Sequence, residues 1–137
     1  MIKKSIVFLT LLIVPIALFQ GCKKSTDAIL TDNLSNVTNI HVDYTDKNKT
    51  DTTINDKKLV KKVYDSIIST KTDIYKNPNE KDAQNSNPAY TIQINYTDGK
   101  NDLIKSTETG EFIYRTLDDK GSWAGGKNLE LEKLISQ

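Results

Sequence analysis

The chain has 137 residues, enough for one small domain but not for two independent hydrophobic cores. Its 19 Lys and Arg residues nearly balance its 18 Asp and Glu residues, giving a net charge of +1, so it lacks the basic excess of nucleic-acid-binding proteins. The single cysteine excludes an internal disulfide, and stability therefore has to come from packing.

The N-terminal segment has the composition of a secretory signal. Lys3 and Lys4 supply positive charge, and an uncharged run of 14 residues follows from Ile6 to Phe19. As a helix this run would span about 21 Å, less than the roughly 30 Å hydrocarbon core of a bilayer. A permanent membrane span is therefore not expected. Small Gly21 then precedes the only cysteine, Cys22.

The stretch Leu18-Phe19-Gln20-Gly21-Cys22 resembles a lipobox, although Phe19 and Gln20 stand where Leu and a small residue are commoner. The resemblance implies a signal peptide over 1–21, cleavage after Gly21 and a diacylglycerol thioether on Cys22. The mature chain would then be anchored to the outer face of the cytoplasmic membrane, or to the outer membrane in a Gram-negative source. The alternatives are an uncleaved signal anchor and a buried or reactive thiol.

Residues 22–39 are expected to form a flexible tether, and residues 40–137 a folded domain. The tether is mostly Ser, Thr, Asp, Asn and Lys, and Ile29, Leu34 and Val37 recur in it at no sustained period. Its roughly 17 residues would hold the domain some 20 to 25 Å from the membrane. Loss of Lys3 and Lys4 with the signal changes the net charge to 1 − 2 = −1.

The first half of the domain is predicted to be a hairpin followed by a helix. Alternating apolar and polar residues predict strands at 40–44 and 50–54. Apolar residues at spacings of one, three and four then predict an amphipathic helix from Asp56 to Ser69, with Asn55 as its N-cap. Its four lysines, Lys57, Lys58, Lys61 and Lys62, are either the solvated face of a packed helix or a surface for anionic lipid headgroups.

The second half is predicted to be a long loop, a three-stranded meander and a short helix. The polar interval 70–89 either binds a partner or is disordered. Strands are expected at 90–96, around Leu103 and Ile104, and at 111–116. A two-residue turn at Asp98-Gly99 would pair Ile94 with Leu103, and a three-residue turn would pair Ile92 with Ile104.

The C-terminal region is predicted to contain a loop over 117–127, with one large aromatic residue, and then the helix. Asn128 is expected to cap this helix, and Leu131, Leu134 and Ile135 form its apolar stripe.

These elements predict an α+β fold with an antiparallel sheet of about five strands, in the order β-β-α-β-β-β-α, and helices on one face. The layout resembles the uncharacterised small α+β lipoprotein domains of low-GC Gram-positive bacteria. It is more loosely similar to the PepSY and β-lactamase-inhibitor type of module. The resemblance covers about 40–137, rests on the order of the elements and transfers no functional residue.

Enzymatic chemistry, a cofactor and a metal site are not expected. His41 is the only histidine and is predicted to lie on the polar side of a strand, and zinc would need more nitrogen and sulfur ligands. Two acidic clusters, one at 46–51 and one at Asp118-Asp119, could be considered for calcium, but the EF-hand pattern is absent.

The sequence therefore favours a lipid-anchored extracytoplasmic module that binds an envelope protein or another ligand. The candidate binding surface is Trp123, with Tyr114, Tyr75 and the polar loop 76–88, because exposed aromatic residues on loops commonly anchor interfaces. The alternative for Trp123 is burial against the core. The alternative function is a small envelope hydrolase or an inhibitor-type domain.

Overall fold

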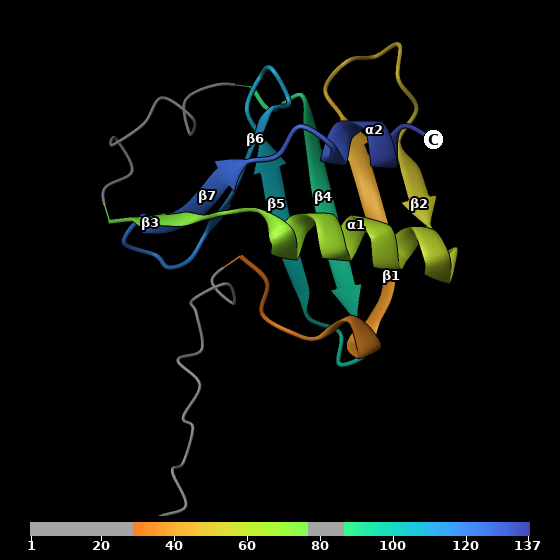
Figure 1. The fold of residues 1–137 in the computed structure, drawn as a ribbon, viewed down its shortest axis with the longest axis horizontal. Coiled ribbons are helices and arrows are strands. Elements are labelled where there is room, and N and C mark those ends of the chain that lie inside the picture. The colour runs from red at the N-terminus through yellow and green to blue at the C-terminus, as the bar shows by residue number, and fades with distance from the viewer. Residues whose placement is uncertain (1–28, 77–86) are drawn as a thin grey trace, which may run out of the picture.

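The computed structural model describes residues 29–76 and 87–137, which form one seven-stranded antiparallel sheet with both α-helices on the same face (Figure 1). The strand order is β2-β1-β4-β5-β6-β7-β3. The elements in chain order are the 3-10 helix η2 (Leu34–Asn36), β1 (Val37–Tyr44), β2 (Thr52–Ile54), α1 (Lys57–Ser69), β3 (Asp73–Tyr75), β4 (Tyr90–Tyr96), β5 (Asn101–Ser106), β6 (Phe112–Thr116), β7 (Trp123–Lys127) and α2 (Leu131–Ile135). No helix in this described part has the length and apolar character needed to cross a membrane.

The predicted α+β class is confirmed, and the sheet has two strands more than expected. One is β3, which lies in the interval predicted to be a loop, and the other is β7, which lies in the predicted loop 117–127. These two strands pair with each other, Tyr75 opposite Trp123, and extend the meander to the edge of the sheet. Gly21, Cys22 and loop residues 77–86 lie outside the described residues.

The β4–β5 hairpin has the register of the three-residue turn. Ile92 pairs with Ile104, so Leu103 lies opposite Gln93 and not opposite Ile94. Gly99 has a φ of 85°, and its amide donates to the carbonyl of Tyr96 at 3.1 Å, closing the turn. The turn needs a left-handed backbone conformation at this position, and glycine adopts it at no steric cost.

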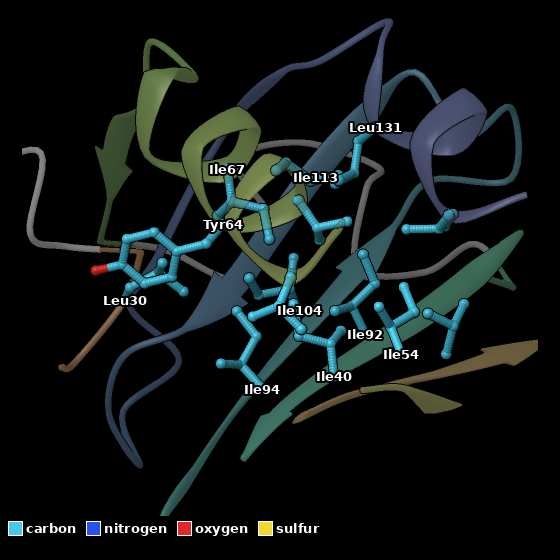
Figure 2. Close-up of a cluster of buried hydrophobic side chains, with 14 of the residues drawn as sticks. Leu30, Ile40, Ile54, Tyr64, Ile67, Ile92, Ile94, Ile104, Ile113 and Leu131 are labelled. Carbon is cyan, nitrogen blue, oxygen red and sulfur yellow. The ribbon is translucent and has the colours of Figure 1, made fainter. Parts of the chain in front are cut away.

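The core lies between the sheet and the two helices (Figure 2). Alternation along the strands sends every second side chain to this face, and the helices supply the other wall. The fully or almost fully buried members in these elements are Ile40, Val42, Ile54, Tyr90, Ile92, Ile94, Tyr96, Ile104 and Ile113 from the sheet, Val60, Val63, Tyr64 and Ile67 from α1, and Leu131 and Ile135 from α2. Each buried aliphatic side chain of this size stabilises the fold by about 1.5–3 kcal/mol.

Residues 29–39 are part of the fold, although residues 22–39 were expected to be a tether. Ile29 and Leu30 are 1% and 5% exposed and belong to the main core, in the same cluster as Tyr64 (Figure 2). The Tyr64 hydroxyl donates to the carbonyl of Asp32 at 2.9 Å. Two adjacent apolar residues without a periodic pattern do not predict burial from the sequence, because the residues that bury Ile29 and Leu30 are far away along the chain.

Side chains bind the first free amides of both helices. Asp56, and not Asn55, is the N-cap of α1, and its carboxylate accepts from the amide of Leu59 at 2.8 Å. The N-cap of α2 is Glu130, and not Asn128 as predicted, but the Asn128 side-chain oxygen still accepts from the amides of Glu130 and Leu131 at 3.1 and 2.9 Å. Its amide also donates to Thr70 at 2.8 Å and thus ties α2 to the end of α1.

Gly125 and Gly126 each allow a close approach to β7, on opposite faces of the strand. A Cβ at Gly125 would lie 2.7 Å from the ring of Phe112, on the uncovered face of the sheet. A Cβ at Gly126 would lie 2.2 Å from the carbonyl oxygen of Lys71, in the segment that joins α1 to β3. The two glycines therefore let an aromatic ring and a backbone segment approach the same strand.

Gly126→Ala is expected to destabilise the protein by about 3 kcal/mol, because the new methyl group meets backbone that is held by α1. Gly99→Ala is the matched control. Its Cβ meets nothing within 4 Å, so only the backbone cost of a positive φ, about 1–2 kcal/mol, is expected. Urea unfolding of the purified variants measures both values, and equal losses would contradict the close contact at Gly126.

Candidate functional site

The uncovered face of the sheet carries an aromatic cluster made of Tyr75, Phe112, Tyr114 and Trp123. Tyr75 stacks on Trp123 with ring centroids 4.0 Å apart, and Phe112 and Tyr114 meet the indole edge-on at 6.2 and 5.9 Å. Burial raises the pKa of the Tyr114 hydroxyl. The structure thus brings together the three predicted binding residues, which come from three different strands.

Trp123 differs from the prediction in its environment. It lies on β7 and not on a loop, and its side chain is 0% exposed. This is the buried alternative, because neighbouring aromatic rings cover the indole. Tyr114 is 5% exposed and Tyr75 is half-buried. An exposed aromatic anchor at Trp123 is therefore absent, and the cluster acts as the hydrophobic support of the neighbouring surface.

A groove lies beside this cluster, where β5 and β6 separate. Their ladder contains only the pairs Lys105–Tyr114 and Ser106–Ile113. Beyond it the strands part and leave a hollow of about 280 Å³, which is lined by Asn101, Leu103, Lys105, Tyr114, Arg115 and Thr116. The groove therefore contains Tyr114 from the predicted surface, together with five residues that the sequence did not indicate.

Backbone groups at the groove have no partner in the ladder. In antiparallel strands, alternate residues direct their N–H and C=O groups to the same neighbour. The Thr107 amide donates to the Phe112 carbonyl at 2.8 Å, so alternation places the next bonding positions at Lys105 with Tyr114, and those after them at Leu103 on β5 and Thr116 on β6. No pair joins these two residues. Two strand edges thus face each other across the groove, as at the edge of an open sheet.

The side chains of the groove combine one apolar group with positive charge. Leu103 is 43% exposed, one of three large hydrophobic residues with this much exposure in the described chain. Lys105 is exposed and forms no ion pair among residues 29–76 and 87–137. Arg115 is only 18% exposed and lies 3.1 Å from Asp102. An extended peptide with an apolar and an acidic side chain would match these groups.

Asp102 lies on the covered face of the sheet beside the groove and binds groups from three other segments. Its carboxylate is 0% exposed and accepts from the Tyr96 hydroxyl at 2.6 Å, from the Thr31 amide at 2.6 Å and from the Thr31 hydroxyl at 2.9 Å, in addition to Arg115. Burial and the bond to Asp102 raise the pKa of Tyr96. These hydrogen bonds and the ion pair compensate the cost of removing the carboxylate from water.

His41 makes one arrangement that resembles hydrolytic chemistry. Its Nδ1 lies 2.9 Å from the Thr53 hydroxyl and its Nε2 lies 3.1 Å from the Asp43 carboxylate. However, the His41 and Asp43 side chains are 38% and 52% exposed, and Thr53 is exposed as well. Nucleophilic catalysis depends on a preorganised, water-excluded site, so this row has the character of a solvated surface.

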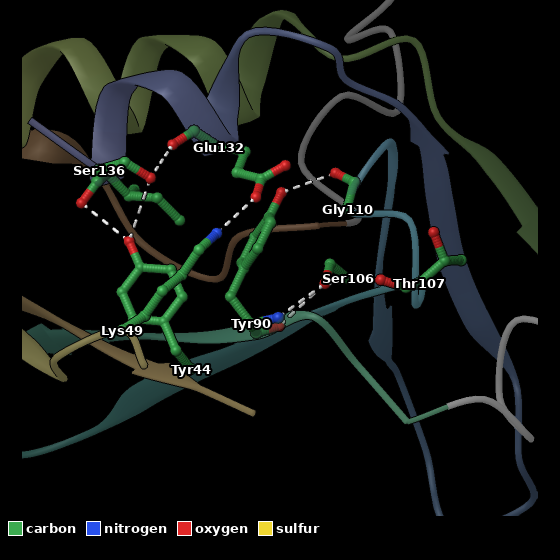
Figure 3. A network of polar contacts seen from close by, with 9 residues as sticks. Tyr44, Lys49, Tyr90, Ser106, Thr107, Gly110, Glu132 and Ser136 are labelled. Carbon is green, nitrogen blue, oxygen red and sulfur yellow. Dashed lines mark hydrogen bonds and ion pairs between the residues drawn. The ribbon is translucent and has the colours of Figure 1, made fainter. Parts of the chain in front are cut away.

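A second polar network fastens α2 to the loops at the other end of the sheet (Figure 3). Lys49 donates to Glu132 at 2.9 Å, which raises the lysine pKa. The Tyr44 hydroxyl donates to the carbonyl of Ile135, and the Tyr90 hydroxyl donates to that of Gly110, both at 3.0 Å. Burial raises the pKa of Tyr90. Because each of these groups bonds to another part of the fold, we assign the network to stability.

Within the described ranges no three His, Cys, Asp or Glu side chains come together to hold a metal ion. The acidic residues considered for calcium instead bind backbone amides of their own loops. Asp46 accepts from Asn48 at 2.9 Å, and Asp118 accepts from Lys120 and Ser122 at 2.9 and 3.0 Å, which lowers the Asp118 pKa. These are turn contacts of the usual Asx type.

Comparison with protein-family models, curated proteins and solved structures gives no match for this chain. The function is therefore argued from the geometry of the groove and from the N-terminal sequence.

Asp102→Asn is expected to destabilise the protein by about 3 kcal/mol, because the new NH2 group would face donors that now bind the carboxylate, and the charge opposite Arg115 would be lost. Asp98→Asn, at an exposed turn, is the control and is expected to change stability much less. Urea unfolding gives the stability. Hydrogen exchange should also show faster exchange of amides 29–33 in Asp102→Asn alone, and unchanged exchange there would contradict the proposed anchoring of Thr31.

Proposed function

We propose that this protein is a lipid-anchored extracytoplasmic module that binds an extended segment of an envelope protein in the groove between β5 and β6. The observation that carries the proposal is the early end of the β5–β6 ladder, which leaves Leu103 and Thr116 facing each other without a pair. An added strand would supply the missing hydrogen bonds, and this is the usual mode of β-augmentation.

The side chains of the groove support an acidic partner. Lys105 is exposed and forms no ion pair with a described residue, and no Asp or Glu lines the groove. The charge of Arg115 is already paired with buried Asp102, so Lys105 supplies the positive charge that a partner would meet. Electrostatic complementarity of this kind selects the partner and speeds its association. Exposed Leu103 would supply the apolar contact, and the rigid aromatic cluster behind Tyr114 keeps the wall of the groove in place.

The N-terminal sequence supports the location. A basic start, an apolar run too short to span the bilayer and the Gly21-Cys22 pair together favour export, cleavage and lipidation of Cys22. Two acyl chains would hold the module stably at the membrane surface. The groove would then be presented to envelope proteins and not to cytoplasmic ones.

The alternative function is a small envelope hydrolase. The row of Thr53, His41 and Asp43 is the observation in its favour. The exposure of its side chains to water, 38% for His41 and 52% for Asp43, favours the binding module instead. An inhibitor-type domain would be a special case of that module. His41→Ala separates the two functions, since it would abolish hydrolysis and leave binding in the groove unchanged.

A photo-cross-linking residue at position 103 is expected to capture an envelope protein in living cells. Lys105→Glu should reduce the yield about ten-fold, because it places a negative charge beside an acidic partner. Lys47→Glu, the same charge reversal at an exposed loop position away from the groove, is the control. Equal yields from the two variants, or equal capture from position 47, would contradict the groove as the binding site.

Cys22→Ala is expected to abolish lipidation and to release the chain from the acyl anchor. Mass spectrometry of the wild-type protein should give a mature N-terminus at Cys22 carrying diacylglycerol, and cell fractionation should show less retention of the variant. Ser25→Ala, three residues later, is the control and should behave like the wild type. A mature product that starts elsewhere with a free thiol would refute the anchor.

A further inference from the structure

Four lysines gather on the solvent side of α1, in its first six residues. Lys57, Lys58, Lys61 and Lys62 are all exposed. Of these, only Lys61 forms an ion pair with a residue in the described ranges, Asp65. The carboxylate of the N-cap Asp56 offsets the positive end of the helix dipole, so the positive charge of this surface comes from the lysines themselves.

This lysine flank adjoins the segment that leads to the N-terminus. Lys57 and Lys61 line a shallow hollow of about 360 Å³ together with Leu34, Val37 and Val60, so the start of α1 and the N-terminal segment share one surface. Asp32 is the acidic residue of that segment, and its carboxylate accepts from Asn33 and Asn36. Against Asp32, Asp56 and Asp65 the four lysines leave a positive excess.

The folded chain begins close to the proposed anchor. Ile29 is buried in the core, and it lies seven residues after Cys22 in the sequence. Even a fully extended chain of that length spans at most about 25 Å, whereas an extended tether from Cys22 to Ile40 would span about 60 Å. The domain is therefore restricted to the layer next to the lipid headgroups if Cys22 carries the anchor.

We propose that the lysine flank of α1 rests on anionic lipid headgroups of the membrane that holds the anchor. This inference rests on the proposed lipidation of Cys22. Each lysine near an anionic surface strengthens binding about five-fold, so four lysines fix the orientation of a domain that the anchor alone leaves free to rotate. The groove residues Leu103, Lys105 and Tyr114 alternate along β5 and β6 with residues of the covered face, so they lie on the face opposite to α1 (Figure 1). With α1 on the membrane, this face points away from the bilayer.

The test uses the mature, lipidated protein reconstituted in vesicles of zwitterionic lipid with or without about one-third anionic lipid. The labelling rates of individual lysines by an amine-reactive reagent are measured by mass spectrometry. We expect Lys57, Lys58, Lys61 and Lys62 to react about three-fold or more slowly on the anionic vesicles, and the difference to vanish in 1 M salt, where the Debye length falls to about 3 Å. Lys105 and Lys127, on the uncovered face, should react equally on both vesicles.

A double variant, Lys57→Gln/Lys61→Gln, should weaken the protection of Lys58 and Lys62, and Lys105→Gln/Lys127→Gln should leave it intact. Equal labelling of the α1 lysines on both vesicles would overturn the inference. Flotation of the vesicles reports the anchor separately. A chain that fails to float refutes the lipid anchor, whereas a chain that floats with unprotected lysines refutes only the lysine contact.

Discussion

The buried carboxylate of Asp102 joins three parts of the chain that are far apart in sequence. Thr31 binds it from the N-terminal segment, Tyr96 from β4 and Arg115 from β6. Removing any partner would leave a charge or a polar group without compensation in a place that water reaches poorly. The fold therefore fixes these segments together, and this constraint determines how β5 and β6 are arranged at their open end.

Arg115 on β6 lies 3.1 Å from Asp102 on β5, so an ion pair joins the two strands beyond the last pair of their ladder. On the other side of the sheet, the aromatic cluster around Trp123 supports β6 through Tyr114 and Phe112. The groove has rigid walls as a result, and a rigid site loses less conformational entropy when an extended segment enters it.

Periodicity in the sequence was sufficient for β1, α1, β4 and the class of the fold, since each of these elements buries one regular face. It failed for β7, whose sequence Trp-Ala-Gly-Gly-Lys looks like a loop. Gly126 is there because Lys71 passes over it, and such a contact leaves no local pattern. Asp102 was missed for the same reason. A lone acidic residue on the inner side of a strand is explained only by partners such as Thr31 and Arg115.

In the candidate site, too, the sequence predicted part of the arrangement, and the rest depends on contacts between distant segments. Tyr114 was predicted as part of a binding surface, and it does line the groove, but Trp123 is buried behind it. Aromatic content indicated the correct half of the sheet, while exposure depended on how Tyr75 stacks on the indole, which requires the unpredicted strand β3. The same dependence on distant contacts governs the N-terminal segment. Ile29 and Leu30 belong to the same core cluster as residues of the sheet and of α1, and their burial places the start of the fold seven residues after Cys22 in the sequence.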